Sequence, residues 1–250
     1  MNKTVKKILI SVCKVVVSVA VVLLLWWLFA IVAKNDLVLP DPWQVVALLG
    51  QLLIKGETYV TLLLTLLRAV IAFALSFGVA LCLTLLVCVF PQTKPFVGGL
   101  VTFLRAVPTI SVILIVMVAL QSSSAVPVAV AFLVVFPVVY SAFLRETENK
   151  QLDDLCKVYN VSTRKKVNYV LLPQISKVML TQCHDGLPLC IKIVIAGEVL
   201  ALPRLGLGKQ MYVAKVNLLT ANVLALTLLA LVVCLVISGI FTLVERKFSK

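Results

Sequence analysis

The sequence predicts an all-α integral membrane protein with six transmembrane helices and both chain ends in the cytoplasm. Of its 250 residues, 62% are hydrophobic and 13% are charged, whereas an ordinary soluble domain is about half apolar and about a quarter charged. Aromatic residues make up only 8%, so Leu, Val, Ile and Ala carry most of the apolar character. That aliphatic bias favours helices over a transmembrane barrel, whose strands alternate apolar and polar residues.

The distribution of positive charge supports this topology. The formal net charge is +13, and in a membrane protein such an excess reflects Lys and Arg in cytoplasmic loops more often than a nucleic-acid partner, so we expect no nucleic acid. Arg68 and Lys192 lie within predicted spans and are left out of the count. With both ends inside, 16 of the other 21 Lys and Arg residues are assigned to the cytoplasmic side and five lie outside, namely Lys34, Lys55, Arg204, Lys209 and Lys215.

The first span is expected over Ile8–Val32. It follows a basic start but is too long for the apolar part of a signal peptide, and no small-residue cleavage site follows, so we expect it to be retained. Pro40 and Pro42 then break the helix, and Pro42 can begin another. Trp43–Ile54 is expected to form a short amphipathic helix at the membrane interface.

The second and third spans each contain an irregularity. Thr58–Phe90 is longer than the roughly 20 residues that one perpendicular crossing needs, so either this helix is strongly tilted or Thr58–Arg68 approaches along the interface. The third span is expected over Phe96–Leu120, with Arg105 inside it and a kink at Pro108. A kink in mid-membrane can line a translocation path or serve packing alone.

The remaining spans are expected over Ala125–Leu144, Ile175–Leu200 and Leu218–Val244. A polar turn at Gln121–Ser124 precedes the fourth, and a loop at Pro203–Gly208 follows the fifth. The chain is thus expected to be a single transmembrane domain with a first helix (1–33), an extracytoplasmic segment (34–57), spans two to four (58–144), a long cytoplasmic loop (145–173) and spans five and six (174–250).

The long cytoplasmic loop contains a short helix with an apolar stripe. Leu152, Leu155, Cys156 and Tyr159 recur at helical spacing, and Asn160 can adopt the left-handed conformation that ends a helix. Ser162 is a candidate N-cap for a second, basic helix over Thr163–Tyr169. Such an amphipathic helix either lies on lipid or docks in the groove of a partner protein.

No segment carries a signature of enzymatic chemistry. The nucleotide-binding pattern GxxxxGK[ST] is absent, as are GxSxG and HExxH. His184 is the only histidine, and the seven cysteines form no CxxC pair, so we assign no metal site and no disulfide. We therefore expect passage of a solute and no catalysis, with the energy for uphill transport supplied by a partner or by an ion gradient.

The cytoplasmic loop resembles the EAA loop of ABC-importer membrane subunits, which runs Glu-Ala-Ala, three residues, Gly, and then an Ile/Val-x-Leu-Pro ending. In "LDDLCKVYNVSTRKKVNYVLLPQI" the leading positions are taken by Asp154, Leu155 and Cys156, the glycine by Asn160 and the final proline by Pro173. The leading triplet and the glycine therefore depart from the family pattern, whereas the ending matches it.

Four further segments are similar, in the right order, to the sulfonate, taurine and nitrate branch of that family. They are "LPDPWQVVALL", "TLLLTLLRAVIAFALSFGVAL", "LRAVPTISVILI" and "AGEVLALPRLGLGKQM". The resemblance implies the MetI-like fold of ABC permeases in a bacterial inner membrane. It also implies a second permease copy, an ABC ATPase dimer that binds ATP and Mg²⁺, and an extracytoplasmic solute-binding protein, with membrane lipid around them and no cofactor on this chain.

The resemblance implies a role for each matched region. Leu152–Tyr159 would be the coupling helix that docks on the ATPase, and the solute would be a small anion such as a sulfonate, taurine, nitrate or bicarbonate. A thiamine precursor or another vitamin-like solute on the same scaffold is the alternative. A self-sufficient secondary transporter is disfavoured because 250 residues without an inverted repeat is small for that class.

Charged residues and glycines in or near the spans are candidates for the path or its gate, since charges inside a membrane usually face a cavity or a partner. Arg68 either snorkels to the interface or forms an ion pair, and Glu198 matches a family position that supports the gate. Lys192 and Glu198 are six residues apart and need not pair, and His184-Asp185 is expected at the cytoplasmic interface. The full set is Arg68, Arg105, Pro108, Lys192, Glu198, Gly206 and Gly208, the two glycines being expected to let the outer loop turn tightly.

Overall fold

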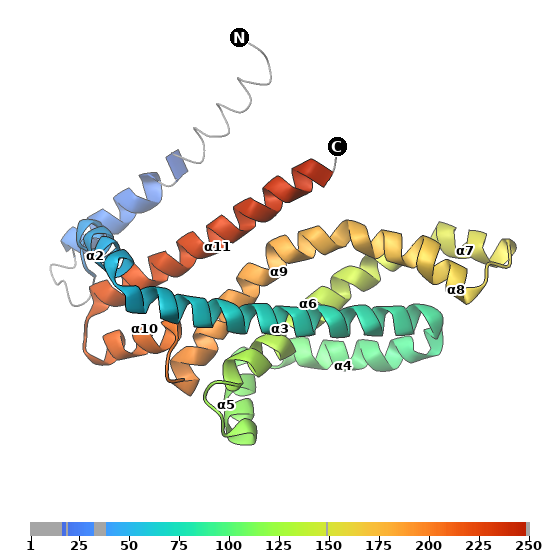
Figure 1. Ribbon diagram of the computed structural model, residues 1–250, viewed down its shortest axis with the longest axis horizontal. Helices are drawn as coiled ribbons and strands as arrows, with labels where there is room; N and C mark the ends of the chain where they lie inside the picture. Colours follow the sequence, from blue (N-terminus) through green and yellow to red (C-terminus); the bar gives the residue numbers. More distant parts are fainter. Residues whose placement is uncertain (1–16, 19, 33–38, 149, 249–250) are drawn as a thin grey trace, which may run out of the picture. The chain divides into compact units, whose positions relative to one another are not determined.

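The computed structural model describes residues 17–18, 20–32, 39–148 and 150–248, and all the regular elements in them are helices (Figure 1). Much of the predicted first span, Ile8–Val32, therefore lies outside the described residues. Contacts divide the chain into two compact units, residues 1–56 with 211–229, and residues 57–210 with 230–250. Each unit is described separately.

The first unit contains the apolar helix Ala20–Val32 and α2 (Pro42–Ile54). Asp41 is the N-cap residue of α2 and Pro42 lies in its first turn, where a missing N–H costs nothing because no intrahelical acceptor is available there. The predicted helix over Trp43–Ile54 is thus confirmed, one residue longer at its start. An open apolar hollow of about 570 Å³ lies between these two helices, lined by residues that include Leu23, Trp27 and Trp43.

The second unit is built on α3 (Gly56–Val89), a single helix of 34 residues that is about 51 Å long at 1.5 Å per residue. Its buried face is made of small side chains, which let neighbouring helix backbones approach closely in a membrane. The hydroxyls on this face bond back to carbonyls of their own helix, as Ser76 does to Ala72 and Thr84 to Ala80. The buried residues are Thr58, Thr61, Thr65, Ala69, Ala72, Ser76, Ala80, Thr84 and Val87.

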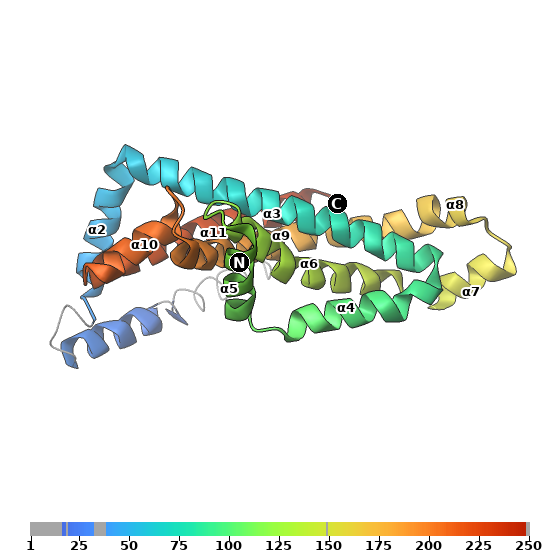
Figure 2. The ribbon, with the colours of Figure 1, turned by 90° about the horizontal axis from the view of Figure 1, so that it is seen from below.

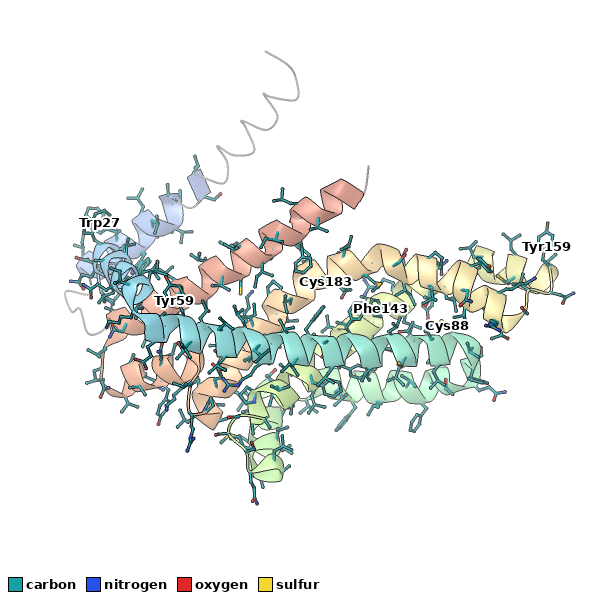
Figure 3. The ribbon with its side chains drawn as sticks, viewed as in Figure 1. Trp27, Tyr59, Cys88, Phe143, Tyr159 and Cys183 are labelled. Atoms are coloured by element: carbon teal, nitrogen blue, oxygen red, sulfur yellow. The ribbon has the colours of Figure 1, made fainter. Side chains whose placement is uncertain are left out.

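The centre of this unit is α6 (Val126–Thr147), which packs along α9 (Leu172–Ala201), as Figure 2 shows. It also packs against α3, where Ser76 Oγ donates to the carbonyl of Phe132 at 3.3 Å. Gly197 of α9 lies so close to Pro127 that an added Cβ would be 3.0 Å from its Cα. Phe143 of α6 meets Phe77 of α3 edge-on, with ring centroids 5.1 Å apart (Figure 3). These contacts make α3, α6 and α9 one packed body.

The third span was predicted as a single helix with a kink at Pro108, and this is wrong because the segment forms two separate helices. After a 3₁₀ turn at Pro91–Thr93, the chain forms α4 (Lys94–Ala106) and α5 (Thr109–Leu120), which meet at 100°. The break falls at Pro108, whose ring disfavours helical backbone at the residue before it, and Val107 is accordingly extended (φ −72, ψ 128). The predicted turn after Leu120 is confirmed, with Gln121 in the left-handed conformation.

Three helices in the described ranges are long and apolar enough to cross a membrane: Gly56–Val89, Val126–Thr147 and Thr220–Val244. The bent pair α4–α5 makes a fourth if it counts as one span. The 30-residue α9 is also long enough, but Asp185, Lys192 and Glu198 interrupt its apolar stretch. A multi-pass membrane protein is thus confirmed, while six spans stays a prediction.

The connection from α6 to α9 contains the predicted short helix, α7 (Lys150–Val158). Asn160 is left-handed at φ 47, as predicted, and the N–H of Val161 bonds to the carbonyl of Cys156 at 2.9 Å, which closes the helix end. The expected basic helix differs: α8 (Thr163–Lys166) passes through a π-helical turn (Val167–Leu171) directly into α9. Pro173 accounts for this turn, because it has no N–H to offer the carbonyl of Tyr169.

Two helices complete the chain, α10 (Leu207–Val216) and α11 (Thr220–Phe248). The predicted sixth span, Leu218–Val244, corresponds to α11. The helix α10 was not predicted, and the loop expected over Pro203–Gly208 overlaps its first two residues, Leu207 and Gly208.

Candidate functional site

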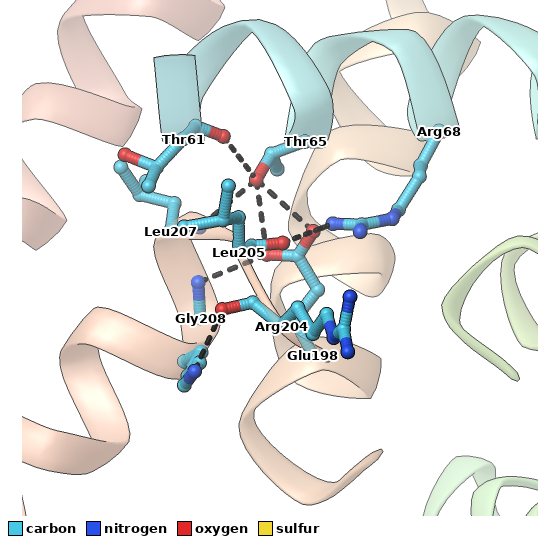
Figure 4. Close-up of polar contacts among 9 residues, drawn as sticks. Thr61, Thr65, Arg68, Glu198, Arg204, Leu205, Leu207 and Gly208 are labelled. Atoms are coloured by element: carbon cyan, nitrogen blue, oxygen red, sulfur yellow. Dashed lines mark hydrogen bonds and ion pairs between the residues drawn. The ribbon is translucent and has the colours of Figure 1, made fainter. Parts of the chain in front are cut away.

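A buried carboxylate near the end of α9 organises the principal polar cluster of the second unit (Figure 4). Glu198 has a relative exposure of 0%, and its Oε1 accepts a hydrogen bond from Arg68 Nη1 at 2.5 Å. Its Oε2 accepts the backbone N–H of Gly208 at 2.9 Å. The ion pair decides between the two interpretations of Arg68: this side chain is 13% exposed and paired within the protein.

The hydroxyl of Thr65 completes the carboxylate's partners. Thr65 Oγ1 lies 3.0 Å from both oxygens of Glu198 and 3.1 Å from the carbonyl of Thr61, so its single proton has three acceptors within reach. The same oxygen accepts the backbone N–H of Leu207 at 3.0 Å. The buried hydroxyl of Thr65 therefore links α3 to α9 and to the start of α10.

The loop between α9 and α10 is held by this cluster through its backbone. Arg68 Nη1 donates to the carbonyl of Leu205 at 2.9 Å, and the N–H groups of Leu207 and Gly208 are bonded as described. The loop begins at Leu202, whose left-handed backbone (φ 48) costs a non-glycine residue about 1–3 kcal/mol. Three backbone hydrogen bonds and one ion pair offset that cost and fix the loop against α3.

Gly206 and Gly208 serve close approach, so the expectation that they permit a tight turn is wrong. Neither has a positive φ. A Cβ on Gly206 would lie 2.6 Å from Glu198 Cδ, and one on Gly208 would lie 2.7 Å from Glu198 Cβ and collide with the carbonyl of Ile195. The two glycines are required because the loop backbone passes directly over the buried carboxylate.

We expect Gly208→Ala to destabilise the protein by roughly 1–3 kcal/mol, because the new methyl group must displace the backbone of α9 or the carboxylate. Gly78→Ala is the matched control: Gly78 lies in α3 with nothing within 4 Å of an added Cβ. This control should be neutral, or stabilising by up to about 1 kcal/mol, since alanine favours helix. The thermal midpoint of the purified protein in detergent measures both; equal midpoints would contradict the close approach.

Thr61, Thr65, Leu205 and Leu207 are the cluster residues that sequence reasoning missed. A signal existed for the threonines: Thr58, Thr61 and Thr65 follow one face of an apolar helix and lead to Arg68 one turn later. The two leucines act through backbone groups only, and no pattern of residue types could indicate them.

The other predicted path residues lie apart from the cluster. Arg105 Nη1 donates to Ser141 Oγ of α6 at 3.2 Å, just before the break at Pro108. Lys192 is exposed on α9 and forms no ion pair with a described residue, and Glu198 pairs with Arg68 instead. His184 and Asp185 contact each other at 2.6 Å near the middle of α9, both partly exposed.

The predicted docking residues fall on the tip of the α6–α9 connection. Leu155 is 52% exposed and Tyr159 76% exposed, while Leu152 and Cys156 are half-buried and Asp154 is exposed. Figure 3 shows Tyr159 at the far end of this connection, directed away from the packed helices. Leu155, Val158 and Tyr159 together form an apolar surface, called here the α7 surface, that no described element covers.

Comparison with known proteins identifies the family to which these features correspond. Residues 89–250, more than half of the chain, match the family described as "Binding-protein-dependent transport system inner membrane component". Among the curated proteins, none matches the chain.

Seven chains of solved structures match. One, described as the crystal structure of an amino acid ABC transporter with histidines, superposes with a TM-score of 0.63 at 15% identity. The alignment covers 76% of this chain and 92% of that chain, so the fold is shared over most of both.

Proposed function

Because the chain belongs to the family of inner membrane components of binding-protein-dependent transport systems, we propose that it forms the translocation path of an ATP-driven importer and is driven through α7. As a permease of this family it works with a separate ATPase and a solute-binding protein. The family's membrane subunits lack an ATPase site of their own. In this chain, α7 would be the element through which the ATPase acts, and the membrane-spanning helices would line the path of the solute.

The observation that carries the proposal is the α7 surface. Leu155 and Val158 on the nine-residue α7 are 52% and 75% exposed, and Tyr159, directly after the helix, is 76% exposed. The connection that bears them joins α6 directly to α9, the two helices packed most extensively against each other. Movement of a partner bound to α7 would therefore be transmitted to α6 and α9 together. Coupling of ATP hydrolysis to transport requires such a connection.

The assembly we propose contains two copies of this chain, an ATPase dimer carrying ATP and Mg²⁺, and an extracytoplasmic binding protein, all in lipid. Each chain would cross a bacterial inner membrane six times with both ends and α7 in the cytoplasm, as the excess of Lys and Arg on that side favours. Docking would involve Leu152, Asp154, Leu155, Cys156, Tyr159 and Asn160, with Pro173 shaping the return into α9.

The cluster around Glu198 is proposed to support the gate at the opposite end of α9 from α7. Arg68, Glu198, Gly206 and Gly208 hold the α9–α10 loop against α3, while Arg105, Pro108 and Lys192 would line the path. The solute proposed is a small anion, such as a sulfonate, taurine, nitrate or bicarbonate. A thiamine precursor or a related vitamin-like solute is the alternative on this scaffold.

Reconstitution tests the proposal directly. The chain would be placed in liposomes with its ATPase, loaded binding protein and internal ATP, and uptake of nitrate, bicarbonate, taurine, a thiamine precursor and histidine would be measured. Uptake that needs both ATP and the binding protein is expected for one of these solutes. Uptake by the chain alone, without ATP, would identify a secondary transporter and overturn the proposal.

A further inference from the structure

Lys192 is a charged residue in the apolar stretch of α9 that the cluster around Glu198 does not use. It lies about 14 Å along the helix axis before Ala201 and about 30 Å after Leu172. The side chain is exposed, and no described acidic group lies within ion-pair distance of it. By contrast, Arg68 is paired with Glu198 and Arg105 is bonded to Ser141.

The exposed stripe of α9 differs from those of the neighbouring long helices. The exposed stripe of α3, from Leu63 to Leu86, contains no charged residue, and the exposed residues of α11 between Leu231 and Leu243 are uncharged as well. These are surfaces suited to lipid. The α9 stripe instead carries Asp185, Lys192 and Ala196, and a lysine facing the hydrocarbon far from a helix end is costly.

The proposed second copy of the chain can cover this stripe. Two copies of one membrane chain that share an orientation are related by a two-fold axis along the membrane normal, so equivalent residues lie at the same depth. If the α9 stripes face the axis, the two Lys192 ammonium groups approach each other across it. Two like charges repel in a medium of low dielectric constant, and a bound anion between them relieves the repulsion.

We propose that the two Lys192 side chains of the assembled importer form an anion-binding site inside the translocation path. The inference rests on the proposed two-copy importer and adds a residue that selects the solute by charge. Positive side chains at equivalent positions around an axis are how anion-selective pores are built. The ligand class is a small inorganic or organic anion bearing a nitrate, carboxylate or sulfonate group.

Accessibility to water tests the position of Lys192 without knowledge of the solute. Lys192→Cys, in a background whose seven native cysteines are replaced, would be exposed to charged, membrane-impermeant methanethiosulfonate reagents in membranes containing the assembled complex. The matched control is Leu75→Cys, since Leu75 is 50% exposed and lies on the uncharged stripe of α3. Labelling at position 192 but not at 75 is expected. No labelling at 192 from either side of the membrane, with or without ATP, would overturn the site.

Charge selection is tested by uptake of radiolabelled nitrate, bicarbonate and methanesulfonate into proteoliposomes. Lys192→Gln is expected to lower uptake of the transported anion about 10–100-fold, the range for loss of a charge-assisted contact, while Lys192→Arg keeps most of it. Wild-type uptake by the glutamine variant, or a wild-type preference for neutral solutes, would overturn the anion site and leave the importer standing. Failure of the wild-type chain to bind an ATPase would instead contradict the proposed function.

Discussion

Replacing Glu198 with alanine is expected to destabilise the protein by about 3–5 kcal/mol, the largest effect of any single substitution in the second unit. The change leaves Arg68, only 13% exposed, without its counter-ion and leaves the N–H of Gly208 without an acceptor. It also removes two of the four contacts that fix the loop beginning at Leu202, namely the ion pair and the hydrogen bond from Gly208. The fraction of monodisperse protein remaining after heating in detergent would report the loss as a lower thermal midpoint.

Two further variants distinguish the loss of the ion pair from the loss of the side chain's packing at position 198. Glu198→Gln keeps an acceptor for Gly208 but loses the ion pair, so an intermediate midpoint is expected. The double variant Arg68→Leu/Glu198→Leu removes both charges and should be more stable than Glu198→Ala, because no buried charge is left unpaired. If Glu198→Ala and the double variant were equally unstable, the cause would be the lost acceptor for the N–H of Gly208, which both changes share, and not the unpaired arginine.

Replacing Leu155 and Tyr159 together with glutamate is expected to weaken ATPase binding about 100-fold or more, since each is an exposed apolar side chain at the centre of the α7 surface. A carboxylate buried in an apolar cleft loses its hydration without gaining a partner. Co-purification of the ATPase with the tagged permease from membranes would measure the loss. The fold should be unaffected, because neither side chain is buried in the protomer.

Tyr169→Glu is the matched control for that experiment. Tyr169 is 78% exposed, close to the 76% of Tyr159, but it lies on the π-helical turn and is not part of the α7 surface. ATPase binding should survive this substitution. Equal loss from both changes would show that any added charge on this connection disturbs assembly, and the docking role of the α7 surface would then be wrong.

Much of the helical framework is predictable because its determinants are local. The prolines at 40 and 42 located the start of α2, and the spacing of Leu152, Leu155, Cys156 and Tyr159 located α7. Asn160 ended that helix in the left-handed conformation, as a short polar side chain allows. Pro108 was correctly identified as an irregularity, but its size was not predictable: a proline removes one hydrogen bond, and the surrounding packing decides whether 20° or, as here, 100° follows.

The sequence by itself determined that this protein lives in a bilayer, where most of its helices begin and end, and which short helix is available to a partner. These follow from hydropathy and periodicity, which depend on residues within a few turns of one another. Only the tertiary structure decided that Arg68 pairs with Glu198, 130 residues away, and that Gly206 and Gly208 make room for that carboxylate instead of turning the chain. The reason is physical: an ion pair and a close approach depend on which helices become neighbours, and the small side chains on the buried face of α3 let neighbouring helices approach it closely.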